Sequence, residues 1–218
     1  MGLSIHYSGH ISDNSLIDDL IKEVEDISKS LDWSYTIIHD DKLKGICCNP
    51  EGSEPVWFTF DLSGRLCSPA SLMRKELNDP FFFINFTKTQ YAGPDAHITI
   101  IKLIRYIEKK YFSSFELCDE GMYWETMNEN ILRNQFAKYG FTLQAVATAL
   151  SNMKRITGET PESLAEKIED ELKKRMNPGS PWHIKQNIQR RKAFFCRMSD
   201  CRGILKSSLF VNFYLFLQ

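Results

Sequence analysis

The chain has 218 residues, 43% of them hydrophobic and 25% charged, and its formal net charge is −1. This is the composition of an ordinary globular protein, and a chain of this length buries enough apolar surface to fold without disulfides or metal. No apolar run approaches the ~18–20 residues of a transmembrane helix, so the sequence excludes a membrane span.

The near-zero net charge conceals two regions of opposite sign. Residues 178–218 contain seven basic side chains and one acidic side chain, a net charge of +6, whereas residues 1–177 contain 20 basic and 27 acidic side chains, a net charge of −7. The acidic region should repel nucleic acid at long range, while the basic region would bind polyanions weakly.

Cysteine usage and the first residues point to a reducing compartment. The six cysteines lack the Cys-x-x-Cys spacing of a zinc ribbon or a thioredoxin motif, so we interpret them as small buried hydrophobic residues. The first residues show no basic and apolar pattern of a signal peptide. The predicted location is therefore the cytoplasm. The cysteines are Cys47, Cys48, Cys67, Cys118, Cys196 and Cys201.

The first half of the chain predicts one helix among short strands. Residues 3–7 alternate between apolar and polar and predict a strand. Residues 16–31 carry apolar side chains at three- and four-residue steps, with Ser12 or Asp13 as the N-cap. The acidic side chains of this helix lie off the apolar stripe and form a solvated face. Further strands are predicted at residues 33–38, 44–48, 56–60 and 65–67, the last two joined by a turn at 61–64.

The second half predicts one long strand and several helices. The longest strand candidate is 81–90, and a helix with Pro94 near its first position follows at 95–111. Residues 115–117 and 122–126 are predicted as extended, and residues 129–150 as a helix that Gly140 divides into two pieces. A last helix is predicted at 160–176, ending at an Asn-Pro-Gly sequence.

This order of elements predicts an α+β fold, with an antiparallel or mixed β-sheet packed against helices in a two-layer or three-layer sandwich. We assign residues 1–177 to a single domain and residues 178–218 to a basic, aromatic-rich C-terminal extension. The apolar run at 209–217 fits a last strand, a docking helix, an aggregation-prone extension or a sequence that is not under selection. If the extension binds nucleic acid or a membrane, truncation at Asn177 should abolish that binding and leave folding intact.

The first candidate site is the segment 88–97, where a strand ends, the chain turns and a helix begins. Backbone N–H groups at a helix start attract anions, and Lys88 and His97 would add charge or transfer a proton. Gln90, Tyr91 and Asp95 would contact a ligand here. In the alternative interpretation, Asp95 complements the helix dipole and the two basic residues are solvated.

The second candidate site is the segment 119–125. Glu120 would act as an acid or a base, and Tyr123 and Trp124 would line a pocket. The alternative is a plain turn whose aromatic side chains cap the core. If neighbouring strands run parallel, the two segments lie at one edge of the sheet and form one site.

Several other chemistries lack their motifs. The sequence contains no Gly-x-Gly-x-x-Gly, no P-loop and no Gly-x-Ser-x-Gly, and its histidines lack the spacing of a zinc site. We therefore predict no cofactor and no metal.

Three segments, residues 1–9, 88–97 and 119–126, resemble motifs of an uncharacterised family of small bacterial cytoplasmic proteins. The resemblance covers about residues 1–150. It implies a folded domain and carries no activity, cofactor or site residue.

Two functional hypotheses follow. The first is a non-catalytic, cytoplasmic binding or regulatory protein of the immunity or antitoxin type, whose acidic surface sequesters a basic partner protein. The alternative is a small enzyme that acts on an anionic small molecule, with Lys88, His97 and Glu120 at one sheet edge. The sequence does not define an oligomeric state.

Overall fold

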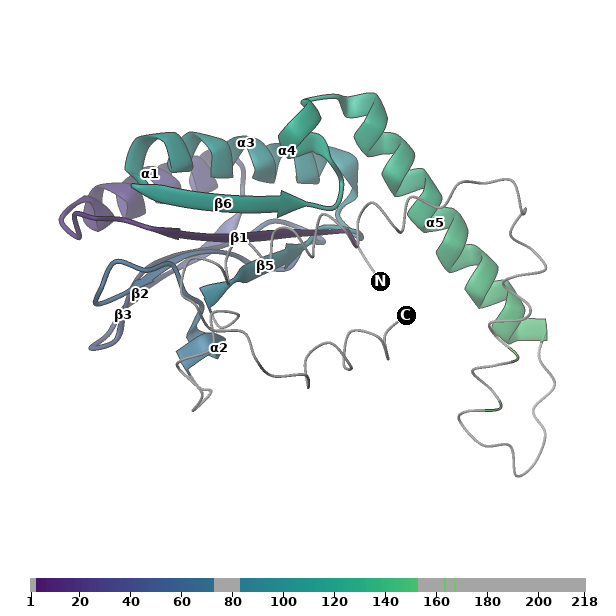
Figure 1. The fold of residues 1–218 in the computed structure, drawn as a ribbon, viewed down its shortest axis with the longest axis horizontal. Helices are drawn as coiled ribbons and strands as arrows, with labels where there is room; N and C mark the ends of the chain where they lie inside the picture. Colours follow the sequence, from purple (N-terminus) through teal and green to yellow (C-terminus); the bar gives the residue numbers. More distant parts are fainter. Residues whose placement is uncertain (1–2, 73–82, 153–162, 164–166, 168–218) are drawn as a thin grey trace, which may run out of the picture. The chain divides into compact units, whose positions relative to one another are not determined.

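The structure is a computed structural model that describes residues 3–72 and 83–152, together with Ser163 and Lys167. The described part of the chain contains two three-stranded antiparallel sheets with helices packed against them (Figure 1). This arrangement confirms the predicted α+β class.

The first sheet has β1 (Ser4–His10) at its centre, between β5 (Asn85–Lys88) and β6 (Ser114–Asp119). Because β1 is antiparallel to both neighbours, β5 and β6 run in the same direction. Their C-terminal ends therefore meet at one edge of the sheet, on either side of the start of β1. This is the geometry under which the two candidate segments become neighbours.

The second sheet is a meander of β2 (Ser34–His39), β3 (Leu43–Asn49) and β4 (Val56–Asp61). All three strands lie where the alternation of residues predicts them. Residues 65–67, predicted as a further strand, instead form isolated bridges. Leu66 pairs with Phe60, and Arg65 pairs with His10, so this short segment connects the two sheets.

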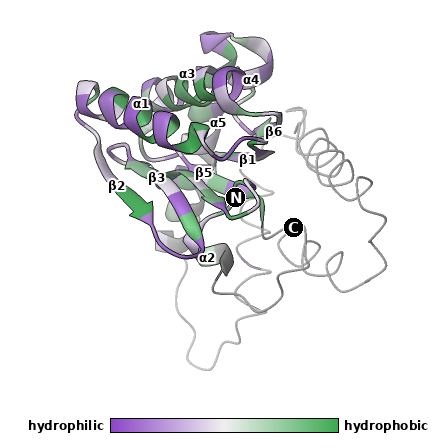
Figure 2. Ribbon diagram, turned by 90° about the vertical axis from the view of Figure 1, so that its left-hand side faces the viewer, coloured by the Kyte–Doolittle hydropathy of each residue, from purple (hydrophilic) through white to green (hydrophobic). Residues whose placement is uncertain are grey.

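Two amphipathic helices, α1 (Leu16–Ser30) and α3 (Gly93–Tyr111), lie side by side on one side of the sheets (Figure 1). Figure 2 shows hydrophilic and hydrophobic bands alternating along both ribbons, as the sequence periodicity predicts. The N-cap prediction for α1 was wrong, because the cap position is Ser15. Asp13 lies two residues before the cap position, and its carboxylate accepts the backbone N–H of Ser15 at 2.9 Å.

Three other predicted elements need correction. Residues 123–126 are helical rather than extended and form α4 (Tyr123–Thr126), because the carboxylate of Asp119 accepts the N–H groups that begin this turn. Helix α5 (Glu129–Asn152) continues through Gly140 without a break. Within the described part of the predicted strand 81–90, only β5 is extended. A short helix, α2 (Pro69–Leu72), follows the second sheet.

A single hydrophobic cluster joins the helices to both sheets. It contains Tyr7 of β1, Phe58 of β4, Leu20 of α1 and Ile104 of α3, each fully buried. Three of the predicted buried cysteines, Cys47, Cys48 and Cys67, are buried, whereas Cys118 is half-buried.

The remaining predictions lie outside the described residues. They are the helix at 160–176, the domain boundary after residue 177, the extension 178–218 and two of the cysteines. Among the helices that the structure describes, none is both long and apolar enough to cross a membrane.

Candidate functional site

The shared edge of β5 and β6 holds a buried polar cluster on the side of the sheet that faces the helices. His97, the fifth residue of α3, has no exposed surface. Its Nδ1 lies 2.7 Å from the Thr89 hydroxyl, and its Nε2 lies 3.0 Å from Oδ1 of Asp119. The second contact brings the atoms together without hydrogen-bond geometry, so we describe it as an electrostatic contact.

Asp119 is the most heavily bonded member of this cluster. Its carboxylate accepts the backbone N–H groups of Gly121, Tyr123 and Trp124 at 2.7–3.0 Å. Burial alone raises the pKa of Asp119, but His97 and these N–H groups outweigh burial and lower the pKa below its ordinary value. The cluster therefore holds an ionised carboxylate inside the protein and joins the end of β6 to the start of α3.

The opposite face of the same edge carries a second histidine and carboxylate pair. Oε2 of Glu120 accepts the backbone N–H of Ser4 at 2.9 Å, and Oε1 lies 3.8 Å from Nε2 of His6. Lys88 lies on this face as well, since Ser4 is its register partner. Its ammonium group lies 3.6 Å from the carboxylate of Glu54.

The three predicted catalytic candidates are therefore divided between the two faces of the sheet. Lys88 and Glu120 share one face, whereas His97 is buried on the other, where α3 packs. The structure does not bring these three side chains together. Sequence reasoning identified the two strand ends but left open whether they share an edge. It missed Thr89, and it could not assign a face to each side chain.

The predicted ligand-binding residues have separate environments. Gln90 is half-buried in the turn and Tyr91 is 76% exposed. Asp95 pairs with Arg133 of α5 at 2.5 Å. Tyr123 belongs to the core, as the alternative interpretation holds.

Trp124, the last of these residues, packs against an arginine. The guanidinium group of Arg105 lies 4.4 Å from the centre of its ring, and Arg105 also donates to the Trp124 backbone carbonyl. The indole therefore holds α4 against α3.

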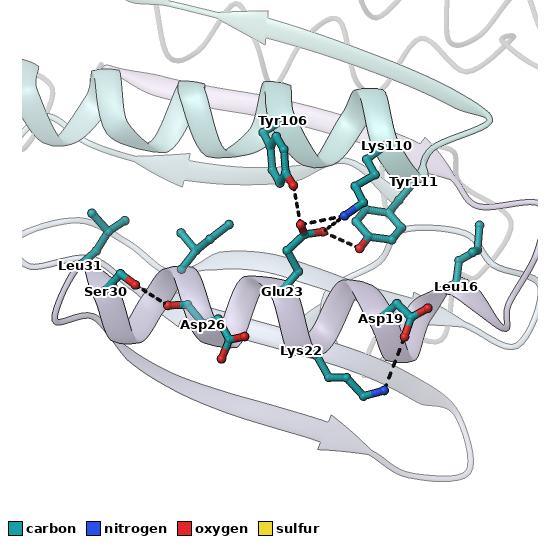
Figure 3. Close-up of a pocket in the computed structure, with 11 residues that line it drawn as sticks. Leu16, Asp19, Lys22, Glu23, Asp26, Ser30, Leu31, Tyr106, Lys110 and Tyr111 are labelled. Carbon is teal, nitrogen blue, oxygen red and sulfur yellow. Dashed lines mark hydrogen bonds and ion pairs between the residues drawn. The ribbon is translucent and has the colours of Figure 1, made fainter.

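An open groove lies between α1 and α3, with a volume of about 980 Å³ (Figure 3). We call it the α1–α3 groove. Carboxylates, apolar side chains and two tyrosines line it together. The lining residues are Leu16, Asp19, Lys22, Glu23, Asp26, Ile27, Ser30, Leu31, Tyr106, Lys110 and Tyr111.

Glu23 crosses the α1–α3 groove and joins the two helices (Figure 3). Its carboxylate accepts hydrogen bonds from the hydroxyls of Tyr106 and Tyr111 and from the ammonium group of Lys110. Burial raises the pKa of Glu23, but the bonds from Lys110 and the two tyrosines outweigh it and lower the pKa. Sequence reasoning gave no signal for this contact, because its partners are more than 80 residues apart.

Comparison with protein-family models, with curated proteins and with solved structures finds no match for this chain. The resemblance to a bacterial family therefore stays a prediction. Within the described ranges, no three histidine, cysteine or carboxylate side chains are grouped closely enough to hold a metal ion.

Proposed function

We propose that this protein is a non-catalytic, cytoplasmic binding protein that holds a basic segment of a partner protein in the α1–α3 groove. The observation that carries the proposal is the groove itself, in which exposed carboxylates flank apolar side chains along one stripe of α1. A groove of this kind suits an amphipathic segment that presents cations beside aliphatic residues.

The carboxylates at the rim are available to a cationic partner. Asp19 is 65% exposed and Asp26 is 80% exposed, and their nearest cations, Lys22 and Lys29, lie 3.4 Å and 3.9 Å away. Exposed ion pairs of this kind contribute little to stability. A lysine or arginine of the partner can therefore take the place of Lys22 or Lys29 at a small cost in free energy. The net charge of −7 over residues 1–177 favours a basic partner at long range.

The apolar lining sets the length and pattern of the partner segment. Leu16 and Leu31 mark the two ends of the stripe, and Ile27 lies between them. Fifteen positions at 1.5 Å each separate the ends, a distance of roughly 22 Å along the helix. A helical partner segment of about 15 residues spans this distance.

An enzyme that uses Lys88, His97 and Glu120 together has less support. His97 is buried behind the sheet, and the ammonium group of Lys88 is paired with Glu54. Because Lys88 and Glu120 lie on one face of the sheet and His97 on the other, one substrate would not reach all three side chains. The binding hypothesis requires no such convergence.

A defined peptide tests the binding proposal directly. The probe is a fluorescein-labelled amphipathic peptide of about 15 residues with leucine at every third or fourth position and lysine or arginine between. The control peptide has the same sequence with glutamate in place of every lysine and arginine. Fluorescence anisotropy with the full chain should show binding of the basic peptide, weakened by salt, and no binding of the acidic one.

Two charge-reversed variants locate the binding surface. The double variant Asp19→Lys/Asp26→Lys should weaken binding of the basic peptide at least about tenfold. The matched control, Asp41→Lys/Glu51→Lys, makes the same change in net charge at two exposed positions outside the groove and should bind like the unchanged chain. Equal weakening in both variants, or equal binding of both peptides, would contradict the proposal.

The same variants identify the natural partner and test the immunity or antitoxin class. Tagged full-length chain and each double variant are used to capture proteins from the lysate of the native host, and the eluates are compared by native mass spectrometry. A basic protein retained by the chain and by the control, and lost from Asp19→Lys/Asp26→Lys, would be the partner. If that partner is a toxic protein, its activity should fall when the chain is added.

A further inference from the structure

The strand β2 forms an exposed edge of the second sheet (Figure 2). Within the described residues its one neighbouring strand is β3, and four of its six residues are exposed. At the end of this pair, the backbone N–H of Asp40 donates to the carbonyl of Leu43. Alternate residues of an antiparallel strand bond to the same neighbour. The backbone groups of Tyr35, Ile37 and His39 therefore point away from β3, toward the open edge.

The other edge strands of the described ranges have features that hinder pairing with a further strand. β5 is four residues long and ends at Lys88, and β6 carries Glu116. The segment after β4 bonds to that strand, since the N–H of Cys67 donates to the carbonyl of Thr59 at 2.9 Å. β2 has six residues and contains no acidic residue, no lysine, no arginine and no proline. An edge without such protection is a template for another strand.

The side of α1 next to β2 carries charges of alternating sign. Glu25 accepts the hydroxyl of Tyr35 of β2 at 2.8 Å, and Asp18 pairs with Lys44 of β3 at 2.7 Å. Both carboxylates therefore lie on the side of α1 that adjoins these strands. Two lysines lie on the same stripe, because residues at three- and four-residue steps share one side of a helix. In chain order the stripe consists of Asp18, Lys22, Glu25 and Lys29.

This order of charges is complementary to its own reverse. When two copies of α1 lie antiparallel, Asp18 of one copy faces Lys29 of the other, and Lys22 faces Glu25. Each charge of the stripe then meets a charge of opposite sign, which favours one arrangement of the two copies. The net charge of −7 over residues 1–177 opposes association at long range, but the stripe itself is neutral. The stripe therefore points to a second copy of the chain as the partner of this edge.

We propose that two copies of this chain associate through β2, antiparallel about a twofold axis, and form one continuous six-stranded sheet. In the register centred on Ile37, this residue pairs with its own counterpart, and Tyr35 pairs with His39. Each copy then donates three backbone N–H groups to the other and accepts three. A register shifted toward the start of β2 would need Trp33, whose N–H already donates within its own chain.

The same pairing covers an apolar side chain and leaves the α1–α3 groove free. Ile37 is 47% exposed, and its counterpart in the second copy would cover it. The twofold axis is perpendicular to the joined sheet, so both copies of α1 lie on one face of it. The groove lies between α1 and α3, on the side of α1 away from β2. Self-association is therefore independent of what the groove binds.

Sedimentation velocity of the full chain at pH 7 and low salt tests the proposal. Between about 1 μM and about 100 μM the chain should pass from monomer to dimer. Ile37→Lys puts two ammonium groups side by side at the axis and should weaken the dimer at least about tenfold. The matched control is Leu62→Lys, at a 77% exposed apolar residue in the turn after β4, and it should associate like the unchanged chain.

A charge exchange tests the antiparallel arrangement of the two helices. Asp18→Lys and Lys29→Glu each place like charges opposite one another twice in the dimer, and each should weaken it about fivefold or more. Neither residue lines the α1–α3 groove. An equimolar mixture of the two variants restores opposite charges at both positions. The mixture should therefore associate within about twofold of the unchanged chain.

Three results would overturn the proposal. The first is a monomer throughout the concentration series, which would leave the edge of β2 to a strand of a different protein. The second is a dimer that Ile37→Lys does not weaken more than Leu62→Lys does. The third is a mixture of the two charge variants that associates no better than each variant alone. If Ile37→Lys fails to fold by circular dichroism, the charge variants decide, because recovery in their mixture requires two folded chains.

Discussion

The carboxylate of Asp119 lies 3.0 Å from the imidazole of His97 at a place where neither side chain is exposed to solvent. The two residues come from different elements, the end of β6 and the N-terminal part of α3, and 22 positions separate them in the chain. Three backbone N–H groups hold the same carboxylate. The contact therefore fixes how α3 and α4 sit on the first sheet.

We predict that Asp119→Asn destabilises the protein strongly at neutral pH. The carboxylate accepts three backbone N–H groups inside the protein, and an amide cannot satisfy all of them, so buried donors lose their acceptor at about 1–3 kcal/mol each. Urea unfolding at pH 7 measures this loss. The exposed control Asp41→Asn should change the free energy of unfolding by less than about 0.5 kcal/mol.

The pH dependence of the same variant follows from the lowered pKa of Asp119. A carboxyl group whose pKa is lower in the folded than in the unfolded state stabilises the fold above the unfolded pKa, near 3.9. That stabilisation is lost as pH falls through the lower, folded value. The difference in the free energy of unfolding between the unchanged chain and Asp119→Asn should therefore be largest at pH 7 and decrease below about pH 4. A difference that stays constant between pH 7 and pH 2 would contradict this role of the charge.

The bond between Glu23 and Tyr111 should couple α1 to α3. In a double-mutant cycle with Glu23→Gln and Tyr111→Phe, we expect a coupling free energy of about 1 kcal/mol, because a phenol donates to a carboxylate at 2.5 Å. Urea unfolding of the four chains at pH 7 gives this value. Since the pKa of Glu23 is lowered, the coupling should persist at pH 5 and fall below the ordinary pKa of about 4.3.

A second cycle controls for effects that are not specific to this pair. Tyr35 of β2 donates its hydroxyl at 2.8 Å to Glu25, which lies on the same helix as Glu23. Glu23→Gln combined with Tyr35→Phe should therefore show a coupling near zero. A similar coupling in both cycles would mean that Glu23 acts through the helix as a whole.

The buried cysteines should react with an alkylating reagent much more slowly in the folded chain than in the unfolded chain. Burial raises the pKa of Cys47, Cys48 and Cys67 well above 8, so almost no thiolate is present, and the side chains are covered. Iodoacetamide at pH 8 should leave all three unmodified in the folded chain and label all three in urea, as measured by peptide mapping. Labelling of Cys67 in the folded chain would show that the bridge at Leu66 opens.

Helices and simple hairpins of this protein could be predicted because their signals are local. The three- and four-residue steps of Leu16, Leu20 and Val24 define α1 regardless of what packs on it. Helix α4 shows where this reasoning fails. Tyr123, Trp124 and Thr126 favour strands, but the preceding carboxylate of Asp119 binds two backbone N–H groups and closes a helical turn.

The candidate sites depend on long-range pairing that the sequence does not contain. The edge shared by Lys88 and Glu120 exists only because β1 lies between β5 and β6. The same pairing places His97 and His6 on opposite faces of the sheet. The α1–α3 groove is still less predictable, since its central contact joins Glu23 to residues more than 80 positions away.

Two glycines, which a sequence-based view treats alike, should respond in opposite ways to a methyl group. Gly64 has a φ of +78° in the turn before the bridge to β1, and an added Cβ would lie 2.2 Å from the carbonyl oxygen of Ile11. Because both the backbone conformation and the contact are unfavourable, Gly64→Ala should lower the free energy of unfolding by about 2 kcal/mol or more. Urea unfolding at pH 7 measures this loss.

Gly140 lies in the continuous helix α5, where an added Cβ would meet no atom within 4 Å. Alanine has the higher helix propensity by about 1 kcal/mol, so Gly140→Ala should slow hydrogen exchange of the neighbouring amides about two- to fivefold. Faster exchange in Gly140→Ala would mean that the helix is interrupted at this residue, as its sequence alone suggests. Slower exchange there, together with a destabilised Gly64→Ala, would show that backbone conformation and local space, rather than residue type, decide what each glycine contributes.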